Sequence, residues 1–162
     1  MIPGAKCRRS GQETQVKNQT AIQEEIEKLG RTYGEEVLSG RTRVVSLPGR
    51  KCEPRILNTF LGFELQVAQK RITCPDMSTA RYLKIFAEIG MPSVRAPYDP
   101  SLTSGVLPQL EQSLRKIKDL LLEENLNRKQ HQSKLRNIYR NIRKNLKMVE
   151  EEVGDRPPEA CP

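Results

Sequence analysis

The clearest pattern of apolar and polar positions lies toward the C-terminal end of the chain. From residue 107 onward, apolar side chains recur three and four positions apart, and they all fall on one heptad count. This spacing predicts one long amphipathic, partly coiled-coil helix over residues 108–153, or two helices in line. The apolar positions, which we call the seam, are Leu107, Leu110, Leu114, Ile117, Leu121, Leu135, Ile138, Ile142 and Val149.

Polar residues interrupt the seam at two places. Glu124, Arg128 and His131 occupy seam positions in the middle of the predicted helix, and Asn145 occupies another near its end. A polar residue at such a position lowers stability but can fix the register and the choice of a partner helix. The same residues equally favour a hinge within residues 123–133 that separates two helices, and the sequence leaves both alternatives open.

A second helical pattern follows a capping box formed by Thr20 and Gln23. Behind the box, apolar residues keep helical spacing. Gly30 and Gly34 lie inside this pattern, and each costs about 1 kcal/mol of helix stability relative to alanine. The glycines therefore favour an end of this helix near Leu29.

Residues 54–72 carry the most hydrophobic pattern of the chain. Pro54 can begin a helix here, because its missing N–H is harmless in the first turn. We expect this helix to lie in the interior of the fold. The apolar positions of its broad face are Ile56, Leu57, Phe60, Leu61, Leu65, Ala68 and Ile72.

A further helix is predicted over residues 77–89. Asp76 or Ser78 can cap its first turn. Gly90 fits the position just after its last turn, and Pro92 blocks its continuation. With the preceding helix it would form a helical hairpin, which we expect to be the compact core.

Prolines and glycines divide the remainder of the chain. Residues 39–54 form a basic connector, in which residues 43–47 can be extended although no obvious partner strand is present. Prolines in and around residues 93–107 keep that strip extended. We expect the strip to pack across the hairpin, in preference to the alternative that residues 97–100 serve as a peptide-like recognition strip.

The expected organisation has four parts. They are a flexible arm over residues 1–19, a small helical region with proline-rich connectors over residues 20–107, the long helix over residues 108–153 and a disordered tail over residues 154–162. The fold class expected from these patterns is all-α, with a small helical hairpin, a long C-terminal helix and flexible termini.

Composition limits the core that this organisation can form. Of the 162 residues, 30% are charged, only 4% are aromatic and none is Trp. A helix of about 46 residues is about 69 Å long, and the other residues are too few to cover it. We therefore expect its distal half to pack on another protein or on a second copy of the chain.

The net charge of +8 is concentrated in the same predicted helix. Between Asn125 and Val149 the chain has eight Lys or Arg residues and no Asp or Glu. Such a field can attract an acidic polymer, either the outside of a microtubule or a nucleic acid, although an ordinary solvated helix face is the alternative. The basic face opposite the seam consists of Lys129, Arg136, Arg140, Arg143 and Lys147.

No residue pattern indicates catalysis, a cofactor or a metal. The only histidine, His131, lies in a polar and basic stretch, and the sequence has neither a nucleophile elbow nor a glycine-rich nucleotide loop. The four cysteines have no C-x-x-C spacing and favour free thiols in a reducing compartment. They are Cys7, Cys52, Cys74 and Cys161. No apolar stretch is long enough to span a membrane, and no leader is evident, so we expect an intracellular protein.

These patterns predict a non-enzymatic helical adaptor, or a subunit of a larger intracellular assembly. The C-terminal helix would meet a protein partner or a second copy of the chain through its seam. A cytoplasmic, cytoskeletal assembly of the centrosome, cilium or spindle type is the leading hypothesis, because small basic coiled-coil proteins often serve there. The alternative is a nuclear protein that uses the basic face to bind nucleic acid, although only Tyr139 is nearby to stack on a base.

Overall fold

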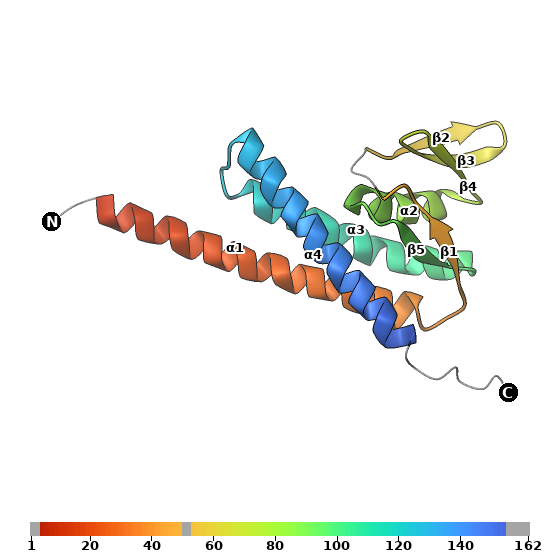
Figure 1. The fold of residues 1–162 in the computed structure, drawn as a ribbon, viewed down its shortest axis with the longest axis horizontal. Helices are drawn as coiled ribbons and strands as arrows, with labels where there is room; N and C mark the ends of the chain where they lie inside the picture. Colours follow the sequence, from red (N-terminus) through yellow and green to blue (C-terminus); the bar gives the residue numbers. More distant parts are fainter. Residues whose placement is uncertain (1–3, 50–52, 155–162) are drawn as a thin grey trace.

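The fold combines α-helices with two small antiparallel sheets (Figure 1). The computed structural model describes the backbone of residues 4–49 and 53–154 and the side chains of residues 16–49 and 53–153. The all-α prediction is therefore wrong. In chain order the elements are α1 (Gly4–Thr32), the π-helical turn η1 (Tyr33–Val37), β1 (Thr42–Ser46), β2 (Arg55–Thr59), β3 (Gly62–Val67), β4 (Lys70–Cys74), α2 (Met77–Ile89), β5 (Ser93–Pro97), α3 (Pro100–Leu122) and α4 (Arg128–Gly154).

The largest correction concerns residues 54–74, where the predicted interior helix is a three-stranded antiparallel sheet, β2–β3–β4. Ile56 of β2 lies opposite Leu65 of β3, and Leu65 lies opposite Ile72 of β4. Leu65 is fully buried against the body of the protein. The helical hairpin expected as the core is therefore also wrong, because only its second helix exists.

The sequence of β3 does contain the signal of a strand. Phe63, Leu65 and Val67 alternate with Glu64 and Gln66, which is the two-residue period of a half-buried strand. The helical period fits the longer stretch only because apolar residues of three short strands are counted together. Two tight turns separate the strands and break that count.

The second sheet joins two segments that are far apart in the sequence. β1 pairs antiparallel with β5, so that Thr42 lies opposite Pro97 and Ser46 lies opposite Ser93. Both segments read as extended in the sequence, but nothing in the sequence pairs one with the other. β5 is the inner strand of the pair, since Val94 and Ala96 are each only 1% exposed.

Helix α2 confirms its prediction at both ends, from Met77 to Ile89. The Asp76 carboxylate accepts a hydrogen bond from the backbone N–H of Thr79 at 2.8 Å, which caps the first turn. Gly90 follows the last turn with a φ of 90°, a left-handed conformation that favours glycine. These signals are local, and a local pattern is sufficient to define both ends.

Helix α3 begins earlier than the sequence pattern indicates, at Pro100 instead of Pro108. The Asp99 carboxylate accepts hydrogen bonds from the N–H and hydroxyl of Ser101, which lower the pKa of Asp99 and cap the helix. Pro100 then occupies the first turn, where its missing N–H is harmless. Pro108 lies inside the helix, on its exposed side.

The polar interruption of the seam is a turn between two helices. α3 ends at Leu122 and α4 begins at Arg128, so the hinge interpretation is confirmed. Asn127 and Gln130 form a reciprocal capping box, in which the Asn127 side chain accepts from the Gln130 N–H at 2.9 Å and the Gln130 side chain accepts from the Asn127 N–H at 3.3 Å. The two helices are antiparallel, and an ion pair joins Lys134 to Glu124 at 2.7 Å.

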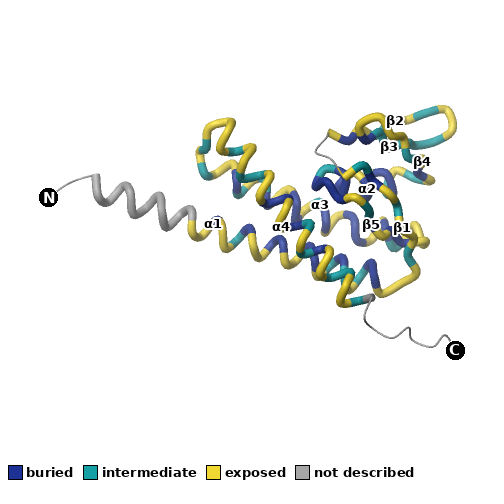
Figure 2. The backbone as a smooth tube through the Cα atoms, viewed as in Figure 1, coloured by how far each residue is buried: buried dark blue, intermediate teal, exposed yellow. Residues whose placement is uncertain are grey.

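Helix α1 begins at Gly4, within the segment expected to be a flexible arm, and it continues past Leu29. It is antiparallel to α3, because Asn18 Nδ2 donates to the carbonyl of Leu120 at 3.3 Å, whereas Glu25 pairs with Lys116 at 3.0 Å. α3 is thus covered by helices from both ends of the chain (Figures 1 and 2). Residues 155–162, most of the expected tail, lie outside the described residues.

Gly30 and Gly34 allow α4 to lie very close to the end of α1. A Cβ atom on Gly30 would be 1.9 Å from Asn145 Oδ1, and one on Gly34 would be 2.7 Å from Val149 Cγ1. The glycines are therefore contact positions between helices, and the helix does not end at them. This contact also makes Asn145, a polar seam residue, part of the α1–α4 packing.

Candidate binding surface on the C-terminal helix

The seam lies inside this chain. Its five positions on α3, from Leu107 to Leu121, are all at most 4% exposed. On α4, Ile138 and Ile142 are buried, whereas Leu135 and Val149 are half-buried. The surrounding helices of the same chain cover these side chains, and the role of the seam toward a partner stays a prediction from the sequence.

The basic face behaves differently, because most of it is exposed. Lys129, Arg136, Arg140 and Lys147 are exposed on α4, together with Lys144, which lies beside them. We call these five residues the cationic row. The row extends about 27 Å along the helix, and the helical period places it on the side away from the buried residues Ile138, Ile142 and Leu146.

Among the residues that the structure describes, no acidic side chain forms an ion pair with the cationic row. None of its five side chains lies within 4.0 Å of an Asp or Glu oxygen. Lys134 is the one cation of α4 that forms an ion pair in this part of the chain, with the buried carboxylate of Glu124. The row thus presents its full charge to the solvent.

Arg143 does not belong to the exposed row, although the sequence places it on the basic face. Its side chain is half-buried, and Nη1 donates to the carbonyl oxygen of Ile89 at 2.8 Å. The bond satisfies one of the last carbonyls of α2, which lack partners within the helix. Gly90 makes room for this contact, since a Cβ there would be 3.0 Å from the guanidinium. Arg143 is therefore a structural residue.

A hollow of about 340 Å³ lies beside the C-terminal half of the row, between α4 and the segment that precedes β5. The sequence pattern does not indicate this hollow, because the two sides are far apart in the chain. The cations of the hollow belong to α4, and Met91 and Pro92 on its other side are apolar. The lining residues are Met91, Pro92, Ser93, Arg140, Arg143, Lys144, Lys147 and Glu150.

Glu150, the single acid in the lining, is held by Tyr33. The Tyr33 hydroxyl donates to Glu150 Oε1 at 2.6 Å and accepts from the backbone N–H of Arg95 at 3.0 Å. Burial, followed by the hydrogen bond to Glu150, raises the pKa of Tyr33 far above its usual range, so the hydroxyl stays a donor. The carboxylate is directed into the protein and leaves the cations of the hollow available.

Comparison with known proteins adds no family. No protein-family model matches the chain, and neither a curated protein nor a solved structure is significantly similar to it. None of the helices among the described residues has the length and apolar character needed to cross a membrane. In the same residues, no group of three or more His, Cys, Asp or Glu side chains is placed to hold a metal ion.

Proposed function

We propose that the protein is a non-enzymatic adaptor or assembly subunit that binds an acidic protein polymer through the cationic row of α4. The observation that carries this proposal is the exposure of five cations on a helix whose opposite side lies in the core, with no acid partner for them among the described residues. An acidic surface such as the outside of a microtubule fits this row, and the cytoplasmic cytoskeleton is the location that we infer.

The shape of the row favours an ordered surface as the partner. The cations are fixed along one rigid helix, since Ile142 and Leu146 on its other side are fully buried. Such a row meets a flat, regularly charged surface without any folding upon binding. The basic hollow next to it adds a recess in which an acidic side chain of the partner can lie.

Single-stranded nucleic acid is the less favoured partner, because the row lacks an aromatic platform. Tyr139 is 6% exposed, and its hydroxyl donates to Glu88 Oε1 at 3.3 Å. It is therefore not available to stack on a base.

The test compares two charge variants of equal size. The row variant carries Arg136→Gln, Arg140→Gln, Lys144→Gln and Lys147→Gln, and it spares Arg143 because that residue supports α2. The control variant replaces Lys17, Lys28, Arg31 and Arg55 by Gln, four exposed cations on other elements. Both variants should keep the helix content and thermal stability of the parent, as measured by circular dichroism.

Binding to microtubules, duplex DNA and RNA is then measured at several salt concentrations. We expect the parent and the control variant to sediment with microtubules, and the row variant to bind weakly and with little salt dependence. If the row variant instead loses duplex DNA, with a fall of up to about four in the log–log salt slope, the partner is nucleic acid. Equal binding by all three proteins would contradict the role of the row.

A further inference from the structure

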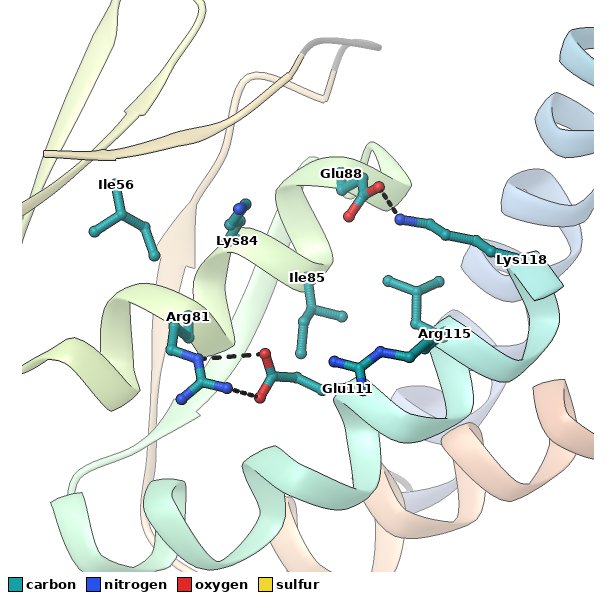
Figure 3. Close-up of a pocket in the computed structure, with 9 residues that line it drawn as sticks. Ile56, Arg81, Lys84, Ile85, Glu88, Glu111, Arg115 and Lys118 are labelled. Carbon is teal, nitrogen blue, oxygen red and sulfur yellow. Dashed lines mark hydrogen bonds and ion pairs between the residues drawn. The ribbon is translucent and has the colours of Figure 1, made fainter.

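Two ion pairs frame a small cavity between α2 and α3 (Figure 3). Arg81 of α2 pairs with Glu111 of α3, and Lys118 of α3 pairs with Glu88 of α2. The pairs lie about two turns apart, or about 10 Å along the helix axes, and their polarities are opposite. The cavity between them has a volume of about 240 Å³.

Both carboxylates of the cavity already have their own cations. Glu111 accepts from Arg81 through both oxygens, with Arg81 Nε at 3.3 Å from Oε2. Glu88 is paired with Lys118 and also accepts from the Tyr139 hydroxyl. Each carboxylate is therefore paired with one cation, and the other cations of the lining have no carboxylate partner in the lining.

Two cations are left over, Lys84 of α2 and Arg115 of α3. Both line the cavity and both are exposed. Within the described part of the chain, neither lies within 4.0 Å of a carboxylate oxygen. Figure 3 shows Arg115 reaching from α3 toward Ile85, while Lys84 lies on the side of Ile56. The lining thus has a surplus of two positive charges.

The floor of the cavity is apolar. Ile85 and Leu114 are each 4% exposed, and Ile56 of β2 adds an apolar wall. A ligand that fits must therefore combine an apolar body with a negative charge. The protein supplies this combination from three elements that only the tertiary fold brings together.

The volume limits the size of such a ligand. A cavity of about 150 Å³ holds a benzene ring, whereas sites for drug-sized ligands and cofactors measure about 300–1,000 Å³. A cavity of about 240 Å³ lies between these values. It has room for one ring with a head group.

We propose that this cavity, the α2–α3 pocket, binds a small organic anion. The ring or short aliphatic body of the ligand lies against Ile85 and Leu114, and its phosphate or carboxylate head meets Arg115 and Lys84. The planar guanidinium of Arg115 can hold an oxyanion through two parallel hydrogen bonds, and Lys84 adds a point charge. The site is separate from the cationic row and independent of its function.

The test is an NMR titration of the full-length, ¹⁵N-labelled chain with phenyl phosphate. Inorganic phosphate represents the head alone, and benzyl alcohol represents the body alone. We expect phenyl phosphate to bind more tightly than either of them, with shifts concentrated in residues 81–88 and 111–118. Shifts that concentrate on α4, or equal affinity for phenyl phosphate and inorganic phosphate, would overturn the proposal.

Two double variants make the assignment specific. Lys84→Gln with Arg115→Gln should weaken phenyl phosphate binding by about tenfold or more, because both contacts to the head are charge-assisted. Lys28→Gln with Arg31→Gln removes two exposed cations of α1 that line neither this pocket nor the hollow beside the cationic row, and it should change the affinity by less than about twofold. Unchanged affinity in the pocket variant would also refute the site. All four positions are exposed, so neither variant is expected to disturb the fold.

A peptide that contains phosphotyrosine presents the same phenyl phosphate group on a protein chain. If this peptide binds to the pocket more tightly than phenyl phosphate, the natural anion is a side chain of a protein partner. If it binds equally or more weakly, the peptide chain adds no affinity, which favours a free small anion. Both results retain the α2–α3 pocket as the anion site.

Discussion

At the scale of single residues, Tyr33 joins α2, β5 and α4. Its ring packs on Phe86 of α2, with the ring centroids 5.5 Å apart, and its hydroxyl contacts β5 and α4. Tyr82 donates to the carbonyl of Arg95 at 2.7 Å, so both backbone groups of Arg95 are bonded to tyrosine hydroxyls. These bonds fix β5 against the helices.

Replacing Tyr33 by Phe keeps the ring but removes both hydrogen bonds. The Arg95 N–H and the Glu150 carboxylate then lose a buried partner, which should lower the free energy of unfolding by about 1–3 kcal/mol. Urea unfolding followed by circular dichroism measures the loss. Tyr98→Phe is the matched control, because Tyr98 is 61% exposed, and its midpoint should equal that of the parent. A Tyr33→Phe midpoint that also equals that of the parent would show that these bonds contribute nothing.

At the scale of elements, the contact between α1 and α4 depends on glycine. Asn145 and Val149 of α4 occupy the positions where a side chain on Gly30 or Gly34 would lie. The cost of glycine in a helix is offset here because side chains of α4 pack directly on the backbone at Gly30 and Gly34. Glycine has no such packing role in α3, because a Cβ on Gly105 would meet nothing within 4 Å.

Two Gly→Ala changes should therefore have opposite signs. Gly105→Ala should stabilise the protein by about 1 kcal/mol through helix propensity alone. Gly30→Ala gains the same propensity but forces the Asn145 side chain out of its place against α1, and we expect a net loss of about 1–3 kcal/mol. Thermal melts of both variants measure the difference. Adding Asn145→Ala to Gly30→Ala should recover part of the loss, and a stabilised Gly30→Ala variant would show that the helices are not in close contact.

A second element-scale prediction separates the strands from the helix that the sequence pattern suggests. Leu61 and Leu65 would share one face of a helix, whereas in the sheet Leu61 is 89% exposed at the β2–β3 turn and Leu65 is fully buried in β3. Leu65→Ala should cost about 2–5 kcal/mol, and Leu61→Ala should change stability by less than about 0.5 kcal/mol. Equal losses in chemical denaturation would favour a helix.

At the scale of the whole molecule, the core is built from both ends of the chain. Ile26 and Leu29 of α1 lie in one buried cluster with Phe86 of α2, Leu110 of α3 and Leu146 of α4. Of the helices that pack on α3, α1 and α4 come from opposite ends of the sequence. The central segment, residues 53–108, therefore has apolar surfaces that the rest of α3, α4, β1 and η1 cover.

This arrangement predicts that the central segment cannot fold alone. A fragment of residues 53–108 should show no cooperative transition in urea, because Phe86 and the apolar side of α2 would face water. The full chain should unfold in one cooperative step. Tyrosine fluorescence and circular dichroism of both proteins test the point, and a cooperative transition in the fragment would indicate an autonomous core.

The sequence by itself determined the features that depend on neighbouring residues. The bounds of α2 follow from a capping carboxylate, a glycine and a proline within the same short stretch. The burial of Ile117 and Ile142 and the exposure of Arg136 and Lys147 follow from the helical period, which assigns each residue to a side. The polar residues at seam positions indicate a break before α4 as one of two alternatives, and the Asn127–Gln130 capping box marks where α4 begins.

Only the tertiary structure decided what lies against each of these faces. An apolar seam indicates that its side chains are buried, but not by what. A helix of the same chain, such as α1, and a helix of a partner can bury it equally well. The pairing of β1 with β5 rests on backbone hydrogen bonds between distant segments, which no local pattern encodes. The α2–α3 pocket and the hollow beside the cationic row arise in the same way, because each combines residues from elements that are separate in the sequence.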